Sequence, residues 1–106
     1  MTVSSHEGGI DFKAINRIAL EHLFDILCRW LPDGQIEGAE YVARNPTRDD
    51  RRPGSFKINL KSGRWADFAT GDQGGDVVSL AAYLAGCSQS EAARQLKIML
   101  GVDENG

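Results

Sequence analysis

The chain has 106 residues, a formal net charge of −3, 42% hydrophobic residues and 25% charged residues. This length supports one domain with a single core, and the lack of an apolar run of about 18 residues predicts no membrane span. Residues 1–9 lack the basic start and apolar stretch of a signal peptide, so we expect a disordered tail there. The two cysteines, Cys28 and Cys87, have no Cys-x-x-Cys spacing and fit a reducing cytoplasm, which predicts a cytoplasmic protein.

Residues 11–31 are predicted to form one long helix. Its charged side chains form a narrow stripe at four-residue spacing, made of Lys13, Arg17, Glu21, Asp25 and Arg29. A polar stripe this narrow indicates that the helix is covered on more than one side. Two interpretations remain open: it is the main core helix of a small domain, or part of it docks a partner or a following domain.

Three strands of a small antiparallel sheet are predicted after the turn at residues 32–34. Residues 40–44 suggest the first strand, and residues 55–60 alternate apolar and polar side chains as a half-buried strand does. The loop between them, residues 45–54, contains Pro46 and Pro53 and so cannot be a central strand. A three-residue turn, residues 61–63, then leads into a strand around Trp65.

The length of that turn predicts the register of the hairpin. With three turn residues, Asn59 lies opposite Trp65, and Lys57 lies opposite Asp67 as a favourable cross-strand charge pair. Trp65 is then expected on the polar face of the hairpin, beside Lys57 and Asn59. We also expect Asp67 to accept hydrogen bonds or ion pairs from Arg48 or Lys57.

Two helices are predicted at the C-terminal end. The first runs from Asp76 to about Ala85 and is stopped by Gly86, while Ser88 and Glu91 form a capping box that opens a last helix closed by Gly101. The expected fold is α+β, with about three strands, one long N-terminal helix and two C-terminal helices. It forms a single domain over residues 10–102, and residues 103–106 are a flexible end or the start of a linker.

Four positions have the spacing of a four-ligand zinc ribbon: Asn45, Arg48, Asp67 and Thr70. The two members of each pair are separated by two residues, so that one tight turn could present both ligands to a tetrahedral zinc ion. The arginine has no lone pair to offer and would repel a dication. We therefore predict a metal-free domain without a cofactor, in which these former metal-ligand positions form polar links between two turns.

The residues around these positions extend the pattern. Motif residues follow in order along the chain: Pro46, Ser55, Phe56, Phe68, Gly71, Gly75, Asp76 and Glu91. From about residue 41 to residue 102 the sequence resembles the zinc-binding domain of bacterial and phage DNA primases, and residues 12–31 fit the leading helix of that family less specifically. The resemblance implies a zinc-ribbon-like fold with a degenerate metal site. It also implies a role in DNA replication, within a primase or primase-helicase of a phage, plasmid or related mobile element.

Positive charge is concentrated around the predicted hairpin. Seven basic residues against two acidic ones give a local excess of five positive charges; the basic residues are Arg44, Arg48, Arg51, Arg52, Lys57, Lys61 and Arg64. Such a patch on an acidic chain favours a local anionic ligand, and Trp65 on the same face could stack a nucleic-acid base. The alternative is a solvated basic loop in which Trp65 covers the edge of the sheet.

The sequence shows no catalytic constellation, so we do not expect this chain alone to be an enzyme. If it is a fragment, the resemblance makes the parent a DNA primase or helicase. The first functional hypothesis is a module that binds single-stranded template DNA weakly and in a salt-dependent way, next to a primase or helicase catalytic domain. The alternative is a protein-interaction module, a primase-like relic that docks a replication partner through Phe24, Leu27 and Leu31 of the first helix. Neither hypothesis involves a membrane.

Overall fold

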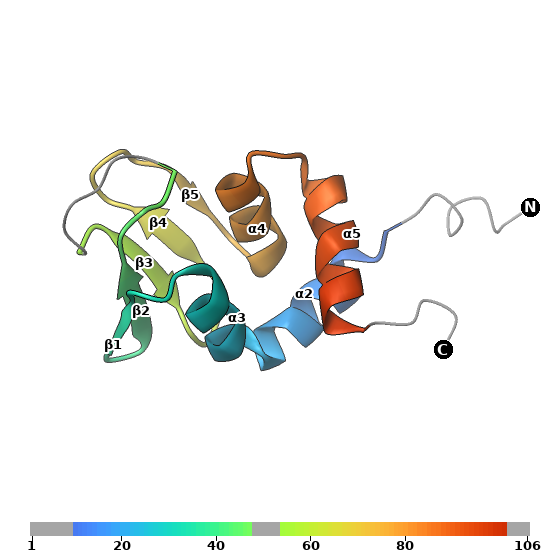
Figure 1. Ribbon diagram of the computed structural model, residues 1–106, viewed down its shortest axis with the longest axis horizontal. Coiled ribbons are helices and arrows are strands. Elements are labelled where there is room, and N and C mark those ends of the chain that lie inside the picture. The colour runs from blue at the N-terminus through green and yellow to red at the C-terminus, as the bar shows by residue number, and fades with distance from the viewer. Residues whose placement is uncertain (1–9, 48–53, 102–106) are drawn as a thin grey trace, which may run out of the picture.

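A computed structural model describes residues 10–47 and 54–101. The predicted tail at residues 1–9, part of the basic loop at residues 48–53 and the predicted flexible end lie outside the described residues. Within the described ranges the fold is α+β, with four helices and one five-stranded antiparallel sheet. The sheet forms one end of the molecule, α5 lies toward the other, and α2 and α3 run along one side between them (Figure 1). The predicted class is confirmed, but the predicted numbers of strands and N-terminal helices are wrong.

The predicted N-terminal helix is divided into two. Helix α2 spans Phe12–Glu21 and helix α3 spans Leu23–Trp30, with His22 between them at φ −116° and ψ 19°. The Asp11 carboxylate caps α2 by accepting the Ala14 N–H at 3.0 Å. Helix α2 packs against α4 and α5, while α3 lies against the sheet through the ring contact of Phe24 with Tyr41. The bend at His22 lets one apolar segment cover both the C-terminal helices and the sheet. The polar stripe in the sequence does not reveal this bend.

The sheet contains two strands that the sequence did not predict. Its order follows the chain: β1 (Gln35–Glu37), β2 (Glu40–Ala43), β3 (Phe56–Asn59), β4 (Trp65–Asp67) and β5 (Gln73–Gly74). Strand β1 is exposed along its length and forms a tight hairpin with β2. Strand β5 has two residues only. Edge strands this short and exposed carry almost no hydrophobic alternation, so pattern reasoning does not detect them.

The register of the β3–β4 hairpin differs by one residue from the prediction. Ile58 lies opposite Trp65, and Phe56 lies opposite Asp67. The cause is Asn59, whose side-chain oxygen accepts the backbone N–H groups of Lys61 and Ser62 at 2.9 Å each. This local turn lengthens the loop to four residues, closed by the 2.8 Å bond from the Gly63 N–H to the Asn59 carbonyl. A slip of one residue moves every side chain of β4 to the opposite face.

The core lies between one face of the sheet and the helices α2, α3, α4 (Val77–Ala85) and α5 (Gln89–Leu100). We call this the inner face; Tyr41, Phe56, Ile58 and Trp65 are buried there. The Trp65 ring packs 4.6 Å from that of Tyr83 on α4, centroid to centroid, and its indole N–H donates to Ser79 Oγ at 2.9 Å. Tertiary packing therefore places Trp65 in the core and not on the polar face.

The C-terminal helices follow their predicted bounds closely. Gly86 and Gly101 end them in the left-handed conformation, at φ 69° and 70°. Ser88 caps α5 by accepting the Glu91 N–H at 3.1 Å. The reciprocal capping box is formed at the start of α4, where the Asp76 carboxylate accepts the Ser79 N–H and Ser79 Oγ accepts the Asp76 N–H.

The buried hydroxyl of Tyr41 leads us to expect a loss of stability at high pH. Its hydroxyl donates to the buried Leu31 carbonyl at 2.6 Å, and burial, followed by the neighbouring Cys28, raises the pKa of the phenol above its usual value of 10.0. The stabilisation is fully present below pH 10.0 and is lost as the pH rises through the higher folded-state pKa. Thermal melts across this range should show the decline, and Tyr41→Phe should flatten it. An equally steep decline in the variant would contradict this assignment.

Candidate nucleic-acid interface and former metal site

The face of the sheet opposite the core carries the cationic and aromatic side chains expected of a nucleic-acid interface. We call it the outer face; register places Lys57 opposite Ala66 and Ala66 opposite Gln73. Phe68 continues this face, because its N–H donates to the Ser55 carbonyl at 2.8 Å and so extends the ladder beyond β4. Its ring is 70% exposed, and Lys57 Nζ lies 5.8 Å from its centroid.

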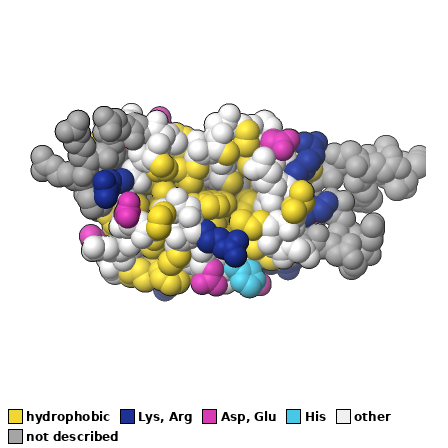
Figure 2. Space-filling view, viewed as in Figure 1, with side chains coloured by type: hydrophobic (Ala, Val, Ile, Leu, Met, Phe, Trp, Pro, Cys, Tyr) yellow, Lys and Arg dark blue, Asp and Glu magenta, His cyan; other side chains and the backbone are white. Residues whose placement is uncertain are grey.

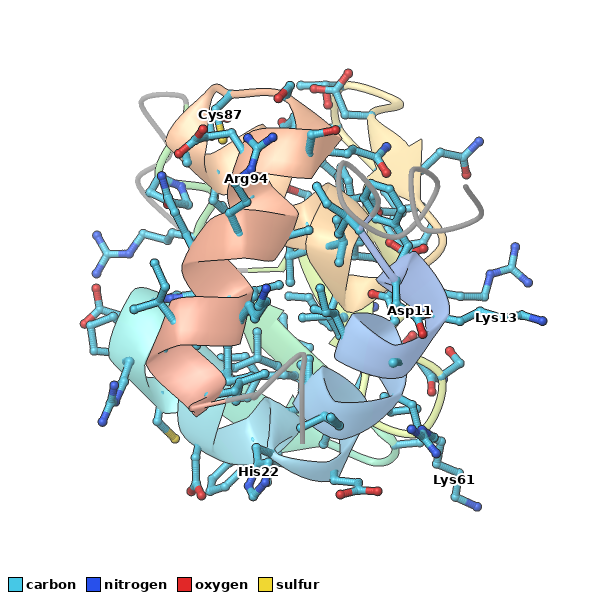
Figure 3. All side chains as sticks on the ribbon, turned by 90° about the vertical axis from the view of Figure 1, so that its right-hand side faces the viewer. Asp11, Lys13, His22, Lys61, Cys87 and Arg94 are labelled. Carbon is cyan, nitrogen blue, oxygen red and sulfur yellow. The ribbon has the colours of Figure 1, made fainter. Side chains whose placement is uncertain are left out.

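The predicted basic residues divide into four groups. Lys57 is half-buried on the outer face, and Arg64 is exposed on the same face because it pairs with Asn59. Lys61 projects outward from the hairpin turn (Figure 3). Arg44, also exposed, has its guanidinium 3.5 Å from the Asp33 carboxylate. Three of the predicted residues, Arg48, Arg51 and Arg52, lie outside the described residues.

The structure does not place Trp65 on this surface. Only 5% of Trp65 is exposed, and its ring is enclosed by Phe56, Tyr83 and Ser79. The prediction that Trp65 lies beside Lys57 is wrong, because it depended on the three-residue turn. The exposed aromatic residue of the outer face is Phe68. The sequence signal for it is the motif, in which Phe68 is one of the matching residues.

Two of the former ligand positions are joined directly. Asn45 and Asp67 are completely buried, and Asn45 Nδ2 donates to Asp67 Oδ2 at 2.8 Å. The link connects the loop after β2 with the turn after β4, so the expected polar connection between the turns is confirmed for this pair. The expected charge pair of Lys57 with Asp67 is wrong, because the register places Phe56 opposite Asp67 and puts Lys57 on the other face. Thr70 is exposed, and its hydroxyl accepts the Asp72 N–H at 3.2 Å. Arg48, the fourth position, lies outside the described residues.

Tyr83 extends this link into a network that the sequence did not suggest. Its hydroxyl donates to Asp72 Oδ2 at 2.7 Å and accepts from Asn45 Nδ2 at 2.8 Å. Asn45 Oδ1 in turn accepts from the backbone and side chain of Thr47 at 2.9 and 2.7 Å. The only available signal was a tyrosine within the otherwise apolar second half of α4.

The side chains at the former ligand positions do not suit zinc. Asn45 directs its amide nitrogen, a donor without ligand capacity, toward the carboxylate that would be its fellow ligand. Asp67 is the single anionic group of the four positions, whereas structural zinc sites use thiolates and imidazoles. Among the described residues, no group of three or more His, Cys, Asp or Glu side chains is placed to hold a metal ion.

A second surface feature lies among the helices. A groove of about 310 Å³ is lined by Trp30 of α3, Pro46, and residues of α4 and α5 that include Leu84, Leu96 and Met99. Apolar side chains gather in the middle of the molecule on the face shown in Figure 2. The docking residues predicted on the first helix lie elsewhere: Leu27 and Leu31 are core residues, and Phe24 is 46% exposed with its ring edge against Tyr41.

Comparison with known proteins gives no assignment: a scan against protein-family models and a search of curated proteins find no match to this chain. The resemblance to primase zinc-binding domains therefore depends on the motif residues alone. None of the described helices is long and apolar enough to cross a membrane.

Proposed function

We propose that the chain is a module that binds single-stranded DNA across the outer face of its sheet. One observation carries this proposal: the most exposed aromatic ring of the sheet, Phe68, lies beside Lys57 on a face that also presents Arg64. An exposed aromatic ring offers a surface on which a base can stack, and a flanking cation can contact the phosphate next to that base.

The chemistry of the face favours a single strand over a duplex. A base can stack on the Phe68 ring only if it is free of its helical neighbours, and stacking tolerates any base because each has a π-face. The cations of Lys57, Lys61 and Arg64 would contact phosphates, which fixes position without reading sequence. We therefore expect weak binding with little sequence preference.

The wider role follows from the motif resemblance. A domain of this kind next to a primase or primase-helicase catalytic domain would hold template strand during DNA replication in a phage, plasmid or related mobile element. On this proposal the chain itself performs no chemistry and needs no cofactor. Its cytoplasmic location and its replication partner belong to the same proposal.

Binding should depend on salt through about three phosphate contacts. The logarithm of affinity should fall against the logarithm of salt concentration with a slope of roughly −2. Phe68→Ala should weaken binding by about 1 to 3 kcal/mol and leave the slope unchanged, because stacking releases no counterions. Lys57→Gln and Arg64→Gln should instead flatten the slope. Fluorescence anisotropy with a short labelled oligonucleotide measures both quantities.

Two variants on other surfaces serve as controls for this titration. Phe12→Ala removes a partly exposed phenylalanine from α2, and Arg94→Gln removes a cation from α5, at the opposite end of Figure 3 from Lys61. Neither should change affinity or slope. If the unaltered protein does not bind at low salt with tens of micromolar protein, the second candidate replaces the first. That candidate is a protein-interaction module, favoured by the apolar groove between α3, α4 and α5.

A further inference from the structure

The turn that carries Phe68 is built by the residue before it. The Asp67 carbonyl accepts the N–H groups of Thr70 and Gly71 at 3.2 and 2.8 Å, and Asp67 Oδ1 accepts the Ala69 N–H at 2.9 Å. These three bonds enclose the peptide units on the C-terminal side of Phe68. On the other side, the Phe68 N–H is bonded to Ser55. The direction in which the Phe68 ring points therefore depends on how firmly Asp67 is held.

Asp67 belongs to a closed ring of hydrogen bonds. Its carboxylate accepts from Asn45 at 2.8 Å, and the same Asn45 amide donates to the Tyr83 hydroxyl at 2.8 Å. The Tyr83 hydroxyl donates to the Asp72 carboxylate at 2.7 Å, and the Asp72 carbonyl accepts the Asp67 N–H at 2.8 Å. The ring connects the loop after β2, the turn after β4 and helix α4.

The ring is anchored in the core at one side and reaches the outer surface at the other. The Tyr83 ring is fixed against Trp65 at 4.6 Å and Phe56 at 6.2 Å, centroid to centroid. Asn45 and Asp67 are completely buried, so their bonds do not compete with water. Phe68, the next residue, is 70% exposed. A rigid buried support directly behind an exposed contact residue is the arrangement that lowers the entropy cost of binding.

We propose that Asn45, Asp67 and Tyr83 are positioning residues that hold Phe68 ready for a stacked base. This inference rests on the proposed function, since it names what prepares that surface. Without this ring of hydrogen bonds, the turn that carries Phe68 would sample several conformations. Each binding event would then have to order the turn. Affinity would fall although every group that touches the nucleic acid is still present.

A double-mutant cycle tests the coupling. Tyr83→Phe removes only the hydroxyl that joins Asn45 to Asp72 in the ring of hydrogen bonds. It keeps the aromatic packing on Trp65. Alone it should weaken oligonucleotide binding roughly threefold to tenfold, with an unchanged salt slope. In a Phe68→Ala background the same change should have almost no effect, because the residue it positions is gone. An equal loss in both backgrounds would overturn the proposal, since it would show that Tyr83 acts independently of Phe68.

A reciprocal exchange provides the second test. Asn45→Asp places two carboxylates together and removes the amide donor from the Tyr83 hydroxyl, so it should weaken binding. The double variant Asn45→Asp with Asp67→Asn restores the amide-carboxylate pair but not the bond to Tyr83, and it should recover part of the affinity. No recovery in a double variant that melts like the unaltered protein would also overturn the proposal. A failure of the proposed function itself gives a different result. In that case neither the unaltered protein nor any variant binds the oligonucleotide, and the positioning role is rejected with it.

Discussion

Replacing Asn45 with alanine should destabilise the fold by about 3 kcal/mol, more than most polar substitutions in a small domain. The change leaves the completely buried Asp67 carboxylate without its 2.8 Å amide partner and removes one donor from the Tyr83 hydroxyl. A buried acceptor that loses one of its hydrogen bonds costs about 1 to 3 kcal/mol, although Asp67 Oδ1 still accepts the Ala69 N–H. Urea unfolding followed by circular dichroism measures the effect.

Gln73→Ala is the matched control, because it truncates an exposed amide on β5 and should change the unfolding free energy by less than about 0.5 kcal/mol. Asp67→Ala should resemble Asn45→Ala, since it removes the other half of the same link. A loss below about 1 kcal/mol for both would show that the pair contributes no more than an exposed contact does.

Placing four cysteines at positions 45, 48, 67 and 70 should create a zinc site. The pair of side chains at positions 45 and 67 already lies within hydrogen-bonding distance, and the spacing within each pair is that of a zinc ribbon. Zinc binding to such a site contributes on the order of 10 kcal/mol, well above the stability lost with the Asn45–Asp67 bond. Elemental analysis should find one zinc per chain, and a chelator should lower the melting temperature sharply.

The unaltered protein is the first control, since its melting temperature should not respond to a chelator. Four serines at the same positions are the second, because they remove the hydrogen bond without supplying thiolates. A folded four-cysteine variant that holds no stoichiometric zinc would show that the four positions do not converge. The likeness to a zinc ribbon would then be one of spacing only, and the primase-related part of the proposal would lose its basis.

Local sequence determined several features of this protein by itself. Alternation over residues 55–60 predicted β3, and Gly86 and Gly101 predicted the ends of the two C-terminal helices, because only backbone preferences and short-range hydrogen bonds decide these features. The ligand-like spacing also predicted polar links between the turns that carry Asn45 and Asp67, although the partner expected for Asp67 was Arg48 or Lys57 and not Asn45.

Tertiary structure alone decided the bend at His22 and the burial of Trp65, because α2 packs against α4 and α5 and Trp65 donates a hydrogen bond to Ser79 in the core. The register of the hairpin, and with it the composition of the outer face, came instead from the local turn at Asn59, which a count of turn residues does not reveal. Because successive side chains of a strand point to opposite faces, the one-residue difference in register exchanged the buried and exposed side chains of β4. The same difference placed Asp67 in the buried network with Tyr83, where the physical support for Phe68 lies.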